Sequence, residues 1–581
     1  MWRKRMMLLL LYFAPLSVHA QPEVDIDRIL DFTGHADPEE LDEYEVDRLA
    51  QYLLHPLKLN VASASGLRSS GLFSPYQVAS LIDYRIRHGD VLSYNELSSV
   101  DGFNETFVNS LEPFVSLEGG SLSNGMTTVD RVRNDIAIKG GAKLSDGELV
   151  EGHGVKYRCR ISDQLSVAVS DALSGHVQWE SPRSRLKIIA GDFNARFGQG
   201  LAMWNGMSMT GFSKPSAFFR SASGVSSSWS FTGSSAHTGI AVEYGRSRVR
   251  LSSFVAFSGI RSKGADGCSV LPALNFGWYG RNVCVSMTHY LEMQPAVSVT
   301  PAHLPDMKTS ADVAMCVRGI DVFSEVAYDW VNATAAALAG TIVPLAENLR
   351  MALHLRYYPS SFSPDRSAAP RSVSKCSNEY GTSICFDYAP RAERLSGSVS
   401  VDAAYLPVSK EEGRESVQLK MMADGSLKLS DQFLLKFRLS ERIRTWGNSF
   451  KTDVRSDLVW TSGYFNATCR INVLKYVDYG FLGFLEAGYK GTKSSVYLKQ
   501  QFFVVDNWDD RIYSYERDAP GSFSVPAFYG RGTSTSLMSS WRFSTWGRVY
   551  LKAGLTVYPF MPPEKKKPGR AELKLQLVFS L

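Results

Sequence analysis

The feature that most constrains this chain is an alternation of apolar and polar residues that recurs over most of its length. It is clearest at the C-terminus, where one face carries Ala571, Leu573, Leu575, Leu577, Phe579 and Leu581. Successive side chains of a β-strand point to opposite faces, so this run predicts a strand with one apolar side. The same alternation predicts further strands over 248–257, 282–291, 351–358, 432–440, 495–503 and 547–558.

The connections between these strands fall into two classes. Tight polar turns such as Gly245-Arg246 join many of them, whereas we expect long connections over 194–235, 360–393, 506–531 and 559–570. Short turns at one end and long loops at the other are typical of a membrane-spanning barrel. Aromatic residues that recur near strand ends suit interfacial girdles; these are Trp179, Tyr290, Trp330, Tyr357, Tyr358, Trp460, Tyr479, Trp546 and Tyr558.

We therefore predict a mainly-β chain. Its body, over 128–581, is expected to form a large antiparallel transmembrane β-barrel of about 22 strands in an outer membrane. A small all-α domain precedes it. A soluble periplasmic β-solenoid or propeller is the alternative, because such folds also alternate. No other apolar run is long enough to cross a bilayer as a helix.

The first twenty residues predict a secretory signal peptide. Arg3, Lys4 and Arg5 form a basic start, and residues 6–16 form a short apolar run. Val18 and Ala20 fit the small-residue cleavage pattern, so residues 1–20 are expected to be removed. An uncleaved anchor helix is disfavoured because the apolar run is shorter than a bilayer core.

Residues 21–118 differ from the barrel in charge and in periodicity. They carry 18 acidic and 6 basic residues, although the whole chain has a net charge of +5. Charge asymmetry of this size indicates a domain boundary. Apolar residues at helical spacing and turns such as Asp101-Gly102 predict a small helical domain in the periplasm. We expect a linker over 119–127.

Part of this acidic domain resembles the competence-type (ComEA-like) helix-hairpin-helix family. Its opening, residues 59–63, reads Leu-Asn-Val-Ala-Ser; Ile82-Asp83-Tyr84-Arg85, Gly89, Glu96-Leu97 and Val100-Asp101-Gly102-Phe103 follow in order. The family binds nucleic acid through glycine-rich hairpins, where backbone N–H groups approach a phosphate. Here the hairpins are degenerate: the first is Leu72, Phe73 and Ser74, and the second is Gly102, Phe103 and Asn104. Because flanking lysines are also missing, nucleic acid is an unlikely ligand.

The whole architecture resembles a group of Gram-negative outer-membrane proteins with a signal peptide, a degenerate helix-hairpin-helix domain and a large barrel. Two further segments carry that resemblance, residues 190–201 and 523–532. If both fold inward and narrow the lumen, Asp192, Arg196 and Arg531 become candidate pore-constriction charges. Turns or bulges are the simpler interpretation of their glycines.

No catalytic or metal-binding motif is present. The chain lacks a nucleophile elbow, a complete phosphate-binding loop and a zinc-binding histidine pattern. We expect no enzyme activity, no cofactor and no metal. Cys376 and Cys385 lie close in sequence and can form a disulfide in an oxidising compartment.

These features predict a channel or transport-type barrel whose periplasmic head is a lid or a docking domain for a protein partner. A closed barrel that serves as a structural anchor or assembly component is one alternative. DNA binding or uptake through the helix-hairpin-helix domain is another. The expected partners are outer-membrane lipid, the barrel-assembly machinery through the C-terminal strand, and a periplasmic protein.

Overall fold

The computed structural model describes residues 26–33 and most of 49–117 in the N-terminal part. It describes 132–581 apart from gaps in turns and loops, the largest being 206–211, 259–268 and 294–305. The predicted signal peptide (1–20), the linker (119–127), Ser74 and Asn104 lie outside the described residues. None of the described helices is both long and apolar enough to cross a membrane.

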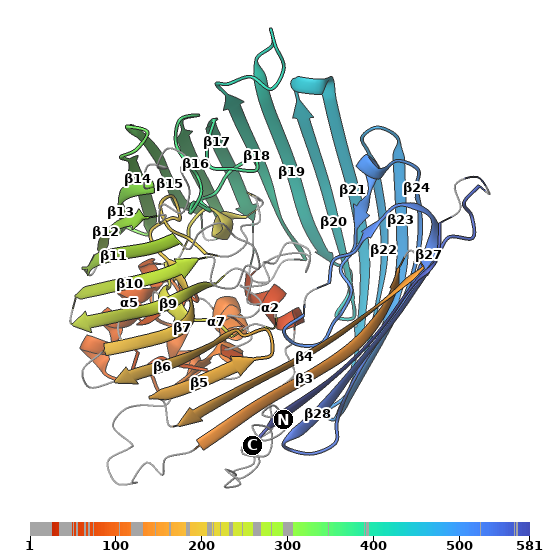
Figure 1. Ribbon diagram of the computed structural model, residues 1–581, viewed down its shortest axis with the longest axis horizontal. Coiled ribbons are helices and arrows are strands. Elements are labelled where there is room, and N and C mark those ends of the chain that lie inside the picture. Colours follow the sequence, from red (N-terminus) through yellow and green to blue (C-terminus); the bar gives the residue numbers. More distant parts are fainter. Residues whose placement is uncertain are drawn as a thin grey trace, which may run out of the picture.

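Twenty-four antiparallel strands close into one barrel (Figure 1). The last strand pairs with the first, with Phe579 opposite Ile136, so the sheet has no open edge. The strands are β3 (Val132–Ser145), β4 (Glu148–Ile161), β5 (Leu165–Ser170), β6 (Gly175–Ser181), β7 (Leu186–Arg196), β9 (His237–Arg246), β10 (Val249–Ser258), β11 (Ser269–Tyr279), β12 (Val283–Glu292), β13 (Asp306–Val317), β14 (Ile320–Asp329), β15 (Thr334–Ala346), β16 (Leu349–Tyr358), β17 (Glu379–Tyr388), β18 (Leu395–Leu406), β19 (Ser416–Lys428), β20 (Phe433–Arg444), β21 (Ser449–Ser462), β22 (Phe465–Lys475), β23 (Tyr479–Lys490), β24 (Ser494–Val505), β27 (Gly530–Arg542), β28 (Gly547–Val557) and β29 (Arg570–Ser580).

The predicted fold class is confirmed, and the 24 strands observed are close to the predicted number of about 22. One missed strand is β17, which lies inside the connection that we expected over 360–393. The long connection itself is shorter and covers 359–378. A short additional strand, β8 (Gly224–Ser227), pairs with the end of β7 and lies outside the closed circuit of strands.

The two ends of the barrel differ in the length of their connections. At the end where β3 begins and β29 finishes, the described strands are joined by short turns such as 247–248 and 318–319. We call this the short-turn end. The three longest connections, 197–236, 359–378 and 506–529, are at the opposite, long-loop end, and the connection 558–569, which was also expected to be long, is there too. This asymmetry is the one that the sequence predicts.

The outer face of the barrel is apolar. On β10, Leu251, Val255 and Phe257 are exposed on the outer face. Arg250 and Ser252, on either side of Leu251, point into the barrel and are buried. Leu274, Phe276 and Trp278 continue the exposed apolar face on β11, opposite β10. An apolar surface around a closed barrel with a polar interior is the arrangement that a bilayer requires.

The predicted aromatic girdle is only partly correct. Trp179, Trp330, Tyr357 and Tyr479 are exposed on the outside as expected. By contrast, Tyr290 and Tyr358 are fully buried. They face the lumen because each lies one residue out of phase with the lipid-facing positions of its strand.

The N-terminal part is a small helical unit. It contains α2 (Ile26–Thr33), α5 (Pro75–His88), α6 (Tyr94–Leu97), α7 (Glu105–Leu111), a 3-10 turn (Glu112–Phe114) and a two-residue parallel pairing of β1 (Leu57–Lys58) with β2 (Val115–Ser116). Its apolar core is separate from the barrel and includes Leu59, Leu81, Leu97 and Phe114. Helix α5 contacts β13, and Asp101 lies near enough to Cys316 for its charge to act on that thiol. Cys316 is next to the 318–319 turn, so the head lies at the short-turn end.

The residues that carry the family resemblance stabilise the head. The buried Asn60 side chain donates to Val91 O (2.9 Å) and Leu117 O (2.8 Å) and accepts from Val91 N (2.9 Å). Arg85 donates to Ala62 O at 2.8 Å and to Asn60 O. The Tyr84 hydroxyl donates to the Glu96 carboxylate at 2.6 Å and holds the pKa of Glu96 below its usual value. These side chains satisfy backbone groups that would otherwise be buried without partners.

Asn60→Ala is expected to lower the free energy of unfolding of the head by about 2–4 kcal/mol, because three buried hydrogen bonds lose one partner. Hydrogen exchange of peptides from 75–111 in the full-length chain measures this change. Asn95→Ala on the exposed side of α6 is the matched control and is expected to change protection little. Equal protection in wild type and Asn60→Ala would contradict this role.

Candidate functional site

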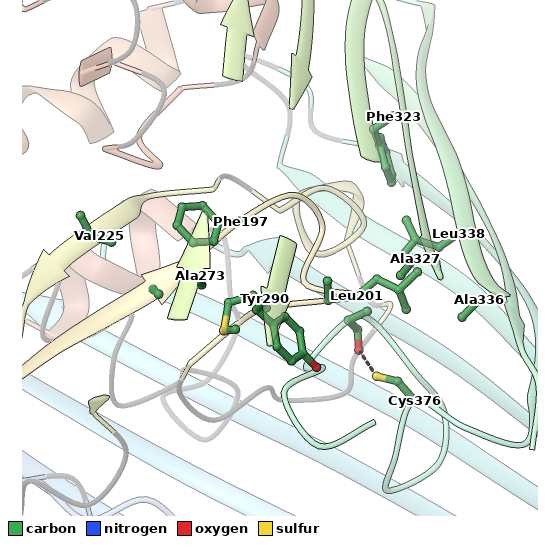
Figure 2. Packing of buried hydrophobic residues seen from close by; sticks show 14 of the residues in the cluster. Phe197, Leu201, Val225, Ala273, Tyr290, Phe323, Ala327, Ala336, Leu338 and Cys376 are labelled. Carbon is green, nitrogen blue, oxygen red and sulfur yellow. Dashed lines mark hydrogen bonds between the residues drawn. The ribbon is translucent and has the colours of Figure 1, made fainter. Parts of the chain in front are cut away.

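The lumen is partly occupied by the three longest connections of the long-loop end. The described residues of 197–231 pack with 359–378 against β7–β17, and the described residues of 506–529 pack against β24, β28 and β29. We call them the first, second and third inward segments, in chain order. The first two share an apolar cluster with the wall (Figure 2), in which Phe197, Leu201 and Cys376 of the segments pack with Tyr290 and Ala327 of the strands.

The first segment is held by a carboxylate of the wall. Glu325 on β14 is 1% exposed, and its carboxylate accepts the backbone N–H groups of Gln199 (2.7 Å), Leu201 (3.0 Å) and Ala202 (3.3 Å). Gly198 and Gly200 have positive φ angles of 57° and 85°, which shape the backbone around the carboxylate. A Cβ on Gly198 would lie 2.8 Å from a Glu325 oxygen. The glycines therefore form an anion-binding turn whose anion is part of the chain.

The second segment is tied to the wall by a buried arginine. Arg356 on β16 donates to Glu379 (2.7 Å), Asp402 (2.7 Å) and the Ser372 hydroxyl (2.8 Å). Its guanidinium also lies 4.6 Å from the centre of the Phe212 ring, in the first segment. Backbone hydrogen bonds from Trp204 N to Arg366 O and from Ala368 N to Gly200 O join the two segments directly. Together they form one body.

The third segment is held by charges and by two apolar clusters that are smaller than the one around the first two segments. Lys552 on β28 and Lys574 on β29 are directly opposite each other, a repulsive arrangement. Asp518 of the segment lies between them, 3.3 Å from Lys552 Nζ and 2.8 Å from Lys574 Nζ. Glu516 adds a contact of 3.4 Å to Lys552, and Lys499 donates to Ser514 Oγ at 2.8 Å.

These contacts bring the third segment to about the middle of the barrel, since Lys499, Lys552 and Lys574 lie midway along their strands. There it meets the first segment. A Cβ on Gly521 would lie 3.1 Å from Lys156 Nζ and 3.6 Å from the Phe231 ring. Lys156 Nζ also lies over the Phe231 and Trp229 rings at 4.2 and 4.3 Å. The first and third inward segments thus meet inside the barrel, beside Lys156 of β4.

The predicted constriction charges do not form one ring. Asp192 is fully buried and accepts from Ser174 Oγ (2.5 Å), Gly175 N (2.9 Å) and Thr238 Oγ1 (2.7 Å), so it joins β7 to its neighbours. Arg196 is also buried, and its guanidinium lies 5.3 Å from the centre of the Trp204 ring. Arg531 lies on β27, is 43% exposed, and pairs with Asp506 at 2.7 Å. Asp192 and Arg196 are both on β7, whereas Arg531 is on β27 and lies apart from them.

The other candidate residues also have defined places. Cys376 and Cys385 are buried as free thiols, so the disulfide is not formed in this structure; Cys376 Sγ donates to Ala369 O at 3.4 Å instead. In the degenerate hairpins, Leu72, Phe73 and Phe103 are buried, and the Phe73 and Phe103 rings lie 6.0 Å apart. Gly102 keeps a positive φ of 84°. These hairpins supply core side chains to the head.

Among the described residues, no group of three or more histidine, cysteine or acidic side chains is arranged to hold a metal ion. One small cavity lies beside the second segment, lined by residues including Phe212, Arg371, Asp402 and Gln418, with a volume of about 30 Å³. That volume suits water rather than an organic substrate. The chemistry that this lumen offers is therefore electrostatic.

Comparisons with known proteins add little to this picture. No protein-family model matches the sequence, and no curated protein is detectably similar. Among solved structures, the siderophore receptor PirA from Acinetobacter baumannii is 7% identical, with a TM-score of 0.40 over 78% of this chain and 81% of that one. A mutant of the ferric enterobactin receptor PfeA from Pseudomonas aeruginosa is 7% identical, with a TM-score of 0.42 over 78% and 81%. The copper transporter OprC is 9% identical, with a TM-score of 0.39 over 78% and 80%.

TM-scores of this size are too low for the ligands of those proteins to bear on this chain. The class of protein follows from its own geometry: an apolar outer face, a closed sheet of 24 strands and a charged interior. It is a transmembrane β-barrel whose lumen is partly filled by its own long loops.

Proposed function

We propose that this chain is an outer-membrane transport protein in which the third inward segment closes part of the passage. The observation that carries the proposal is the manner in which that segment is held. Lys499, Lys552 and Lys574 bind it through ion pairs and hydrogen bonds, which water and ions can replace when it leaves. A segment that never leaves the lumen would not require contacts that water and ions can replace.

The first two segments differ in extent of apolar packing, because they share a large cluster with β7–β17. The third segment contributes Ile512, Ala519 and Phe528 to two smaller clusters. The first two segments act as the fixed part of the lumen, and the third segment acts as the movable part. A closed barrel that serves only as an anchor is disfavoured, since it would gain more from an apolar third interface than from buried charges.

The head acts as a lid or docking domain at the short-turn end, which faces the periplasm in barrels of this class. Its contact with β13 supports this role. Binding of nucleic acid is disfavoured because Leu72, Phe73 and Phe103 are buried in the head. The apolar outer face of β29, with Leu573 and Leu575, is the surface that we expect lipid and the barrel-assembly machinery to contact.

The test is the permeability of proteoliposomes to small solutes. Tyr513 and Ala527 are directly opposite each other, so Gly-Gly can replace 514–526 as a two-residue turn. This variant is expected to admit solutes that wild type excludes. The matched control replaces the exposed loop 407–415 by Gly-Gly, since Leu406 and Ser416 are also opposite each other. Equal permeability of the two variants would refute the proposal.

A further inference from the structure

The inward face of β19, β20 and β21 carries a row of like charges near the long-loop end. Lys420, Arg442 and Lys451 are directly opposite one another on these three strands. Arg444 follows one inward position further along β20, at the rim. Side chains directly opposite on neighbouring strands lie about 5 Å apart, and like charges there are destabilising. These strands lie on the far side of the barrel from β5–β7 (Figure 1).

Deeper rows on the same strands are neutralised. Arg438 pairs with Asp424 at 2.6 Å, and Arg470 pairs with Asp457 at 2.7 Å. The upper row differs, because among the described residues Arg442, Arg444 and Lys451 form no ion pair with a carboxylate. The sheet therefore balances some lumen charges but leaves Arg442, Arg444 and Lys451 without a carboxylate partner among the described residues.

The carboxylates near the row have other partners. Asp402 on β18 lies directly opposite Lys420 and accepts from Arg356 at 2.7 Å. Asp453 accepts from Asn472 Nδ2 at 3.2 Å, and Asp510 accepts the backbone N–H groups of Val477 (2.8 Å) and Asp478 (2.9 Å). Glu441 is on the outward face and accepts from Thr452 Oγ1 at 2.6 Å. The third inward segment adds another positive charge near Lys451, Arg511.

The geometry also holds the cations in place. Arg442 and Lys451 converge on the Tyr476 ring, at 6.0 and 5.7 Å from its centre. Arg444 lies 5.2 Å from the centre of the Trp446 ring and donates to Gln418 Oε1 at 2.7 Å. The Arg442 Nε is buried without a hydrogen-bond partner. All three side chains remain partly exposed, so a solute in the lumen can reach them.

We infer that Arg442, Arg444 and Lys451 form a binding site for a small multivalent anion that carries carboxylates or phosphates. Such a ligand removes the repulsion within the row and supplies acceptors to the guanidinium groups. The site is near the long-loop end, which faces the exterior in barrels of this class, so an entering solute meets it first. This inference names the substrate class of the proposed transport function and rests on that function only for passage of the anion.

The test is titration calorimetry of the full-length protein in detergent at low and high salt, with citrate and pyrophosphate as probes. Wild type is expected to bind at least one of them, with affinity that falls as salt rises. Binding of citrate alone identifies carboxylates, and binding of pyrophosphate alone identifies phosphates. Arg442→Gln/Lys451→Gln is expected to weaken binding about tenfold or more, because two charge-assisted contacts are lost.

Two further variants keep the test decisive. Asp424→Asn/Arg438→Gln removes a neutralised pair from the same strands and is expected to leave affinity within about twofold, since those side chains are already paired. Arg442→Lys/Lys451→Arg keeps the charge and is expected to retain binding. Absence of binding to wild type by both probes, or equal binding by Arg442→Gln/Lys451→Gln, would overturn the inference. Calorimetry needs no open passage, so it can fail while the permeability test succeeds.

Discussion

Lys552→Met is expected to release the third inward segment from the wall. Lys552 is 1% exposed at its side chain and lies within 3.5 Å of carboxylates from Glu516, Asp518 and Glu572. Removing one partner from a buried charge network costs about 3–5 kcal/mol, because uncompensated charge remains behind. Hydrogen exchange of peptides that cover 512–528 is the measurement, and these peptides are expected to lose protection.

The control for this variant is Lys574→Met. Lys574 contacts the same Asp518, but its side chain is 36% exposed, so water replaces much of its interaction. Its effect on the protection of 512–528 is expected to be smaller, at about 1 kcal/mol. Equal loss of protection in both variants, or none in Lys552→Met, would show that buried charge does not hold the segment.

Glu325→Ala is the second large effect that we expect. The carboxylate accepts three backbone N–H groups of the first inward segment, at Gln199, Leu201 and Ala202. Hydrogen bonds to a charged group contribute about 1.5–3 kcal/mol each and are not additive, so a loss of about 3–5 kcal/mol is expected. Protease cleavage after Arg196 or Arg220 is the measurement and is expected to become faster.

Two substitutions distinguish the carboxylate from the size of the side chain. Glu325→Gln keeps the volume and one acceptor, so its effect is expected to be intermediate. Gly198→Ala leaves Glu325 intact but places a Cβ 2.8 Å from its oxygen at a positive φ of 57°, so it is expected to resemble Glu325→Ala. Unchanged cleavage in Glu325→Ala would mean that the apolar cluster alone holds the segment.

The barrel strands were largely predictable because their signal is local. The runs predicted over 248–257 and 547–558 correspond to β10 and β28 within one residue at each end. The last strand, predicted from residue 571 to the C-terminus, is β29. β17 was missed although it alternates, with Tyr380, Ile384 and Phe386 on the outward face and Ser383 and Asp387 on the inward face. It was placed within the long connection expected over 360–393.

The candidate site was predictable only in part. An inward path of 190–201 and 523–532 was one of two interpretations of the sequence; in the structure 190–196 belongs to β7 and 530–532 to β27, and the adjoining connections lie in the lumen. The sequence does not suggest that Glu325 fills the glycine turn, because that contact joins positions over a hundred residues apart. The opposition of Lys552 and Lys574 was not predictable either, because it depends on the register of β28 and β29.

The basic row on β19, β20 and β21 was not predictable from the sequence for the same reason. Lys420, Arg442 and Lys451 become neighbours only through the register of β19, β20 and β21. A strand pattern gives the face on which each side chain lies, but register depends on turn lengths across the whole hairpin. Electrostatic features of a lumen are therefore visible only once the strands are paired.

The most direct test of the account is single-channel recording of the purified chain in a planar bilayer, beside the variant with Gly-Gly in place of 514–526. If the third inward segment closes a transport passage, wild type stays mostly closed and the variant shows large, stable conductance steps. A variant that inserts and is folded but is as silent as wild type would contradict the account, and would indicate a barrel that the first two segments keep closed.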